Sequence, residues 1–281
     1  MNWSQRLDTV GVWRGVGDVD PALAATVEEL GYGTLWLGSS PGSHLRPVDD
    51  LLAATTSLRV ATGIVNIWMS NPDELADSYH RIGAKHPGRL LLGIGSGHRE
   101  ATPERTRPLD AMARYLDVLD ERGVPAGARV LSALGPRMLA LAAGRSAGTH
   151  PYLTVPAQTR EARATLGPDA LVAPEQTVVL DADPDSGRRA ARAFLRRYLA
   201  LSNYTTSMKR GGFTDDDVAG GGSDRLLDAM VVHGDEAAIK ARVQDHLDAG
   251  ADHVCVQVLP VGNQYGIARD EWRRLAPALV G

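Results

Sequence analysis

The segment GIGSGH, residues 93–98, combines three glycines at alternate positions with a terminal histidine, directly after an apolar run. Glycine has no Cβ, so it lets the backbone approach a flat ligand or a phosphate closely. The spacing differs from the dinucleotide-binding fingerprint, and the Gly-Lys-Ser/Thr of a Walker A loop does not occur in the sequence. The run therefore indicates either a ligand loop of another kind or a turn that binds nothing.

His98 closes this glycine run. A histidine at the end of a strand can give or take a proton near neutral pH, which makes it a candidate catalytic residue. The alternative is a structural histidine held by hydrogen bonds. In the preceding strand candidate, Gly63 and Asn66 interrupt an apolar sequence. They predict a bulge with close ligand approach, or a simple bend.

Two prolines mark helix starts after later strand candidates. Pro136 follows Gly135 and precedes Arg137, and Pro156 follows Thr154 after one residue, with Thr154 expected as the cap. The free amides of a first helical turn bind anions, so either start could hold a phosphate. Each could equally be an ordinary capped helix.

Other kinds of site are excluded by composition and spacing. The chain has no HExxH zinc motif, and no Gly-x-Ser-x-Gly nucleophile elbow. Its single cysteine, Cys255, excludes a disulfide framework and a multi-cysteine zinc site, so we expect no metal. A net charge of −4 gives no electrostatic footprint for nucleic acid or an anionic membrane. The expected partner is a small molecule.

These residues have to be positioned by an alternation of strands and helices. Short apolar runs alternate with amphipathic stretches, which indicates parallel strands in either an open doubly wound sheet or a closed barrel. Eight candidates favour the (β/α)8 TIM barrel, whose site lies at the C-terminal strand ends. The strand candidates are Thr9–Trp13, Thr34–Gly38, Val60–Asn66, Leu90–Gly95, Val130–Leu134, Thr149–Thr154, Thr177–Ala182 and His253–Val258.

One stretch breaks the alternation. Ser202–Ser223 is polar and rich in glycine, and it is too long for an ordinary connection. We interpret it as an insertion between strands seven and eight that flanks the site, with a plain surface loop as the alternative.

The 281 residues suit a single barrel domain, residues 1–281. The N-terminus lacks the layout of a signal peptide, and no apolar run approaches the roughly 20 residues that cross a bilayer. Together with the lone cysteine, this predicts a cytoplasmic protein.

The segments ATGIVNIWMSNP (from Ala61) and HPGRLLLGIGSGH (from His86) resemble the luciferase-like monooxygenase superfamily, most closely its actinobacterial branch, which uses the deazaflavin coenzyme F420. ALGPRMLALA (from Ala133), GTHPYLTVP (from Gly148) and HLDAGADHVCVQVLP (from His246) extend the resemblance over nearly the whole chain. The resemblance implies a (β/α)8 barrel, a homodimer, and an oxidoreductase that transfers a hydride between F420, or FMN as the alternative, and a small organic substrate.

The resemblance also implies residue roles. In relatives a non-prolyl cis peptide in strand three supports the middle ring of the cofactor, and the matching bond is Gly63–Ile64. The residue that ends the strand-four loop faces the ring. Relatives often carry a general-acid glutamate there, and this chain has His98. The expected cofactor-binding residues are Gly63, Ile64, Asn66, Gly95, Ser96, Gly97, Ala133, Gly135, Pro136, Arg137 and Thr154, and the expected substrate pocket is Trp13, Ser39, Trp68 and Met69.

The chain departs from the family at the end of strand two, where deazaflavin-binding relatives often have an acidic residue and this chain has Ser39. This departure implies either a different substrate or impaired catalysis. The alternative function is therefore an accessory protein that binds the cofactor without turnover. A flavin-free aldolase is disfavoured, because lysines 85, 209 and 240 do not lie at strand ends.

Overall fold

A computed structural model describes residues 3–98, 107–262 and 266–281. The strands are β1 Val10–Gly15, β2 Thr34–Gly38, β3 Arg59–Thr62, β4 Val65–Asn66, β5 Leu90–Gly95, β6 Arg129–Leu131, β7 Gly148–Thr149, β8 Leu171–Val172, β9 Glu175–Leu180, β10 Val231–Gly234 and β11 Val254–Val258. The helices are α1 Pro21–Glu29, α2 Arg46–Ala53, α3 Pro72–Lys85, α4 Pro108–Glu121, α5 Pro136–Arg145, α6 Pro156–Leu166, α7 Pro184–Leu199, α8 Ser202–Arg210, α9 Asp215–Val218, α10 Asp224–Met230, α11 Glu236–Asp248 and α12 Arg269–Leu279.

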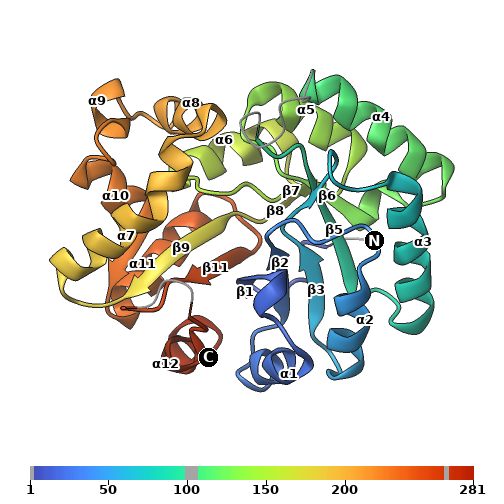
Figure 1. The fold of residues 1–281 in the computed structure, drawn as a ribbon, viewed down its shortest axis with the longest axis horizontal. Coiled ribbons are helices and arrows are strands. Elements are labelled where there is room, and N and C mark those ends of the chain that lie inside the picture. Colours follow the sequence, from blue (N-terminus) through green and yellow to red (C-terminus); the bar gives the residue numbers. More distant parts are fainter. Residues whose placement is uncertain (1–2, 99–106, 263–265) are drawn as a thin grey trace.

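All paired strands run parallel in a curled sheet, with helices on its outer side (Figure 1). From β1 to β8 the spatial order follows the chain order, without the reversal that defines a doubly wound sheet. β11 returns to lie between β1 and β9. The amide of Ala173 donates to Thr149 O (3.0 Å) and that of Cys255 donates to Pro174 O (2.9 Å). The segment from β8 to β9 therefore bonds to β7 on one side and to β11 on the other.

Local sequence signals explain where the outer helices begin and end. At α1, Asp20 accepts a hydrogen bond from the Leu23 amide at 2.7 Å, and Pro21 occupies the first turn. Asp235 caps α11 in the same way. Gly31 and Gly250 follow these two helices with φ of 88° and 98°, a conformation that favours glycine.

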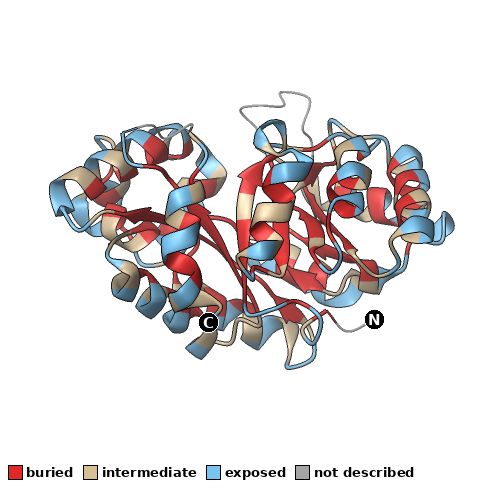
Figure 2. Cartoon of the chain, turned by 90° about the horizontal axis from the view of Figure 1, so that it is seen from below, coloured by how far each residue is buried: buried red, intermediate tan, exposed pale blue. Residues whose placement is uncertain are grey.

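The core consists mainly of aliphatic side chains. Every residue of β2, β5, β9 and β11 is buried, as expected for parallel strands covered on both faces (Figure 2). Inside the sheet, Trp36 stacks on His150 at 3.9 Å between ring centroids, and Trp36 Nε1 donates to His253 Nε2 at 3.0 Å. Neutral imidazoles thus fill part of the interior.

Three expected strands differ from the observed ones by more than a shift of two residues at an end. Strand three splits into β3 and β4 around a cis Gly63–Ile64 peptide. Strand five is limited to β6, and strand six to the two residues of β7. Pro151 lacks an amide hydrogen and Leu153 has a φ of 54°, so the pairing cannot continue toward Thr154.

The segment Ser202–Ser223 forms α8 and α9, so it is not the plain surface loop that was the alternative to an insertion beside the site. Because the segment is mostly polar, its sequence did not predict the amphipathic helix α8, which buries Tyr204 and Met208. β10, which pairs with β9, was not predicted.

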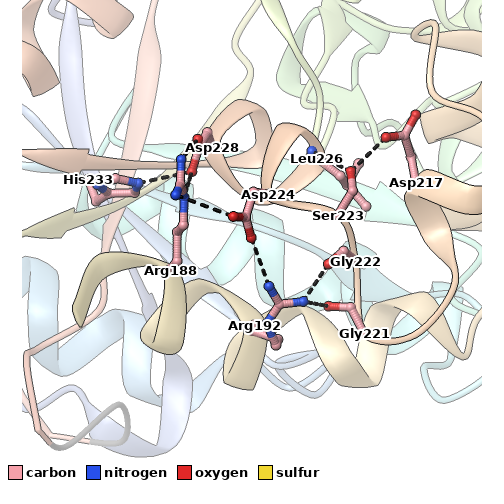
Figure 3. A network of polar contacts seen from close by, with 10 residues as sticks. All are labelled: Arg188, Arg192, Asp217, Gly221, Gly222, Ser223, Asp224, Leu226, Asp228 and His233. Atoms are coloured by element: carbon pink, nitrogen blue, oxygen red, sulfur yellow. Dashed lines mark hydrogen bonds and ion pairs between the residues drawn. The ribbon is translucent and has the colours of Figure 1, made fainter. Parts of the chain in front are cut away.

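A network of arginines and aspartates joins α7 to α10 (Figure 3). Arg188 makes two hydrogen bonds to Asp228, of 2.9 and 2.6 Å, and an ion pair of 3.3 Å with Asp224. Arg192 bonds to Asp224 and to the carbonyl of Gly222. We name these contacts the α7 clamp, because they fix a helix that carries residues of the cavity described next.

Candidate functional site

A cavity of about 770 Å³ opens at the C-terminal ends of the strands. This volume is typical of small-molecule sites. It has two walls of different character. The glycine wall comes from β4, β5 and the segments beside them and consists of Gly63, Ile64, Asn66, Gly95, Ser96 and Gly97. The aromatic wall comes from β1, the segment after β7, α7 and α8, and consists of Trp13, Tyr152, Tyr198 and Tyr204.

The glycine wall is shaped by close packing of backbone. A Cβ on Gly95 would lie 2.7 Å from the Ile64 side chain, and one on Gly97 would lie 2.5 Å from Asn66 Nδ2. Gly97 also has a φ of 53°. Trp68 Nε1 donates to Ser96 O at 2.8 Å, which braces the loop from outside the cavity. The wall therefore offers a surface of backbone, the aliphatic side chain of Ile64 and the small polar side chains of Asn66 and Ser96.

The aromatic wall is a connected set of rings. Trp13 and Tyr152 lie 5.8 Å apart between centroids, and Tyr198 and Tyr204 lie 5.0 Å apart. Trp13 Nε1 also donates to Gly63 O at 3.3 Å, which links this wall to the glycine wall. Gln158 on α6 holds α8 through hydrogen bonds of 3.1 and 3.0 Å to the carbonyl and hydroxyl of Ser207.

His98 lies between the two walls. Its ring is 5.1 Å from that of Tyr204, and its Nδ1 is 3.3 Å from Asn203 Nδ2. If the Asn203 amide donates to Nδ1, the neutral imidazole carries its proton on Nε2. Asn203 Oδ1 is buried and has no hydrogen-bond partner within the described part of the chain. It can therefore accept a hydrogen bond from a ligand.

Most of the expected site residues line this cavity: Trp13, Ser39, Gly63, Ile64, Asn66, Met69, Gly95, Ser96, Gly97, His98 and Gly135. Met69 lies at the rim with 70% of its surface exposed. Ser39 has a φ of 60° and adds no charge.

The other expected residues do not line it. Trp68 lies behind the Ser96 backbone, and Ala133 is buried in the core against Leu139. Pro136 and Arg137 line an adjoining cavity of about 550 Å³, which shares Gly135 with the main one. Thr154 is buried with an unpartnered hydroxyl among the described residues. The N-cap of α6 is Val155, one residue later, so the expected Thr154 cap is wrong.

Sequence reasoning missed much of the aromatic wall and both cavity arginines. Tyr152 follows a strand and could have been found from that position. Tyr198 and Tyr204 lie on helices, where their spacing indicates only core packing, and Arg197 and Arg210 resemble solvated surface charges. Among the described residues, the cavity lining includes these two arginines and no carboxylate.

Burial shifts the pKa values of several groups below and beside the cavity. It lowers the pKa of His150 to about 4, and the Ala173 carbonyl, 2.7 Å from Nδ1, opposes that shift only in part. His150 is therefore neutral at pH 7. Burial raises the pKa of Glu175 to about 7, against the hydrogen bonds that it accepts from Thr177 and the Leu153 amide. Burial also raises the pKa values of Tyr152 and Tyr204, which remain protonated phenols.

The cavity residues fit a flavin-type ring. On the glycine wall, Gly63, Gly95 and Gly97 stand beside Ile64, its one aliphatic side chain. The adjoining cavity past Gly135 is lined by three arginines, Arg107, Arg137 and Arg210, and by one carboxylate, Asp110, and this excess of positive charge suits an anionic tail. Metal ligation finds no such support, since the described segments contain no group of three or more His, Cys, Asp or Glu side chains arranged for an ion. In the same segments, no helix is both long and apolar enough to cross a membrane.

Known proteins resemble this chain in sequence over one segment and in fold over nearly its whole length. Residues 20–122 match the family model described as luciferase-like monooxygenase. No curated protein sequence matches the chain. Among solved structures, an F420-dependent secondary alcohol dehydrogenase in complex with an F420-acetone adduct aligns with a TM-score of 0.73 and 14% identity, over 97% of this chain and 99% of that one.

Two further structures are similar over almost their whole length. The coenzyme F420-dependent tetrahydromethanopterin reductase from Methanopyrus kandleri has a TM-score of 0.68 and 16% identity, with 98% of both chains covered. The oxygenating constituent of 3,6-diketocamphane monooxygenase from Pseudomonas putida, in complex with FMN, has a TM-score of 0.67 and 13% identity, with 96% of both covered. The chain thus has the curled α/β fold of luciferase-like oxidoreductases, and its residues 20–122 carry the sequence pattern of that family.

Proposed function

We propose that this protein is a luciferase-like oxidoreductase that transfers a hydride between coenzyme F420 and a small organic substrate. FMN is the alternative cofactor. The observation that carries the proposal is the glycine wall, a side-chain-poor surface beside the cis Gly63–Ile64 peptide in a cavity of about 770 Å³. The family match over residues 20–122 and the two F420-dependent neighbours support it.

The residues of the chain divide the work between the two walls. The glycine wall binds and orients the ring, and the aromatic wall excludes water from the opposite side. F420 supplies or accepts the hydride when it is bound. His98 moves the accompanying proton at Nε2, because Asn203 occupies Nδ1 and the ring faces the space between the walls.

Titration of the purified protein with F420 and, separately, with FMN tests this function. Quenching of cofactor fluorescence with a micromolar dissociation constant is expected for F420, with weaker binding of FMN. Absence of binding to both at 100-fold higher concentrations would reject the proposal. Tighter binding of FMN would replace the cofactor and keep the reaction class.

One observation favours the second candidate, an accessory protein without turnover. At the end of β2, exposed Ser39 supplies no carboxylate to the cavity. Cofactor binding with no oxidation of the reduced cofactor by any of a panel of quinones, ketones and enones would favour this candidate over the enzyme.

A further inference from the structure

We propose that the aromatic wall binds a planar aromatic substrate that carries an ionised oxygen, a phenolate or an enolate. This inference rests on the proposed function, because it names the substrate class for the same cavity. It is carried by the ring geometry of the wall, by a chain of hydrogen-bonded phenols that ends on an arginine, and by the charge of the cavity.

The rings of the aromatic wall form a continuous surface. Tyr152 lies 5.8 Å from Trp13, 5.6 Å from Tyr198 and 6.2 Å from Tyr204 between centroids, with interplanar angles of 40°, 51° and 64°. Aromatic pairs favour such tilted and edge-to-face arrangements at 4.5–7 Å. A flat aromatic guest in the cavity finds ring edges and faces on this side, whereas an aliphatic guest gains none of the directional part of that attraction.

The phenol groups form a polar chain on the same wall. Arg197 Nη2 donates to Tyr198 Oη at 2.8 Å, the Tyr198 and Tyr152 hydroxyls are 2.9 Å apart, and the Tyr152 hydroxyl donates to Gln257 Oε1 at 2.8 Å. Each phenol has one hydrogen. Because Tyr152 gives its hydrogen to Gln257, Tyr198 gives its own to Tyr152 in the free protein.

A ligand oxyanion can enter this chain at Tyr198. The guanidinium of Arg197 lies 4.6 Å from the centroid of the Tyr198 ring and is held over the wall by that contact. Its planar fork has five donors, so it can bind an oxyanion through charge-assisted hydrogen bonds. The Tyr198 hydroxyl joins it by turning its one hydrogen from Tyr152 to the ligand, while Tyr152 keeps its bond to Gln257. A neutral guest of the same shape would make weaker bonds at the same place.

The charge of the cavity agrees with an anionic guest. Arg197 and Arg210 line it, and within residues 3–98, 107–262 and 266–281 no Asp or Glu does. The two arginines lie in different places: Arg210 lies beside Gly135 at the entrance to the adjoining cavity, and Arg197 lies beside the aromatic wall. A cofactor tail can therefore use Arg210 while the substrate uses Arg197.

The test compares two probes, 2-hydroxy-1,4-naphthoquinone, which is an enolate at pH 7.5, and 1,4-naphthoquinone, which has the same rings and no ionised oxygen. Isothermal titration calorimetry of the full chain, with and without oxidised cofactor, gives both dissociation constants. We expect the enolate to bind at least tenfold more tightly than the neutral quinone. Equal affinities, or absence of enolate binding at millimolar concentration, would overturn the inference.

Variants separate the polar and aromatic contributions. Tyr198→Phe keeps the ring and should reduce the preference for the enolate about tenfold, as should Arg197→Gln, whose exposed side chain makes misfolding a lesser concern. Tyr204→Leu should weaken the binding of both probes by the same factor. The control Tyr79→Phe makes the same chemical change on α3, away from the cavity, and should change neither affinity.

An unchanged preference for the enolate in both Tyr198→Phe and Arg197→Gln would contradict the assignment. The outcome is distinct from that of the cofactor titration. If the enolate binds with the expected dependence on Tyr198 and neither cofactor binds, the proposed redox function fails and the ligand class stands. If a cofactor binds and the enolate preference is absent, the function stands and this inference fails.

Discussion

Nδ1 of His98 lies 3.3 Å from Nδ2 of Asn203, so a helix of the aromatic wall orients the histidine that ends the glycine run. The two residues are far apart in the sequence, and α8 brings them together across the cavity. When the Asn203 amide donates to Nδ1, the proton of the neutral imidazole lies on Nε2. It explains how a residue on a glycine-rich loop can hold a defined geometry.

His98→Ala is expected to slow hydride transfer from reduced cofactor to 1,4-naphthoquinone by about 10²–10⁴-fold, the usual contribution of a general acid or base. Stopped-flow absorbance under anaerobic conditions measures the rate. Asn203→Ala keeps the imidazole and removes its orienting partner, so its loss should be smaller. A His98→Ala rate within about threefold of wild type would remove His98 from the mechanism.

Gly97→Ala should weaken cofactor binding at least tenfold, because the new Cβ would displace Asn66 from the glycine wall. Gly123→Ala is the matched control. Gly123 also has a positive φ, 72° against 53° for Gly97, and nothing lies within 4 Å of its Cβ position. Both variants should lose about 1 kcal/mol of unfolding free energy from the left-handed backbone. Equal cofactor affinity in the two variants would show that the wall does not bind the ring.

Glu175→Gln should change how stability depends on pH. Burial raises the pKa of Glu175 from 4.5 to about 7. Between these values the folded protein keeps a proton that the unfolded chain releases, so the contribution of Glu175 to stability falls as pH rises through that window. Glutamine does not ionise, so the stability of the variant does not fall in this window for that reason. Relative to wild type, the free energy of unfolding of the variant should increase by on the order of 3 kcal/mol between pH 4.5 and 7.5.

Urea unfolding of both proteins at several pH values measures this difference. Buried His150 and His253, with pKa values lowered to about 4, make stability rise with pH from about 4 to 6.5, and they do so in both proteins. Their effect therefore cancels in the comparison. A difference between the two proteins that stays constant with pH would show that Glu175 has an ordinary pKa.

Arg137→Ala should raise the dissociation constant of F420 about fivefold at low salt, because the side chain lines the adjoining cavity expected to hold an anionic tail. Raising the salt concentration to 500 mM should shrink the difference, since exposed charges are screened. Arg160→Ala removes the same charge from an exposed position on α6, outside both cavities, and serves as the control. Equal effects of the two variants would indicate general electrostatics instead of a tail site.

The parts of this protein that follow local rules could be predicted from its sequence. Asp20-Pro21 and Gly31 delimit α1 because capping and positive φ are properties of a few adjacent residues. The run GRLLLGIG predicts a strand buried on both faces, and β5 is one. The position of the glycine wall follows from the same local signals, since Gly63, Gly95 and Gly97 end or follow strands.

The aromatic wall could not be predicted in this way. Tyr198 and Tyr204 meet Tyr152 because α7 and α8 fold back over the strand ends, and that path depends on distant contacts such as the α7 clamp and Gln158–Ser207. The early end of strand six has a local origin instead, since Pro151 removes a donor and Leu153 takes a left-handed conformation. The period-two apolar pattern that predicts strands indicates neither the path of α7 and α8 nor the early end of strand six.

Crystals of the protein soaked with F420 test the proposed cofactor site, because they show where the tricyclic ring lies. We expect density for the ring in the main cavity, in van der Waals contact with the glycine wall on one side and open to His98 and the aromatic wall on the other. A ring bound at any other place, or a main cavity that stays empty while F420 binds in solution, would contradict the proposed site.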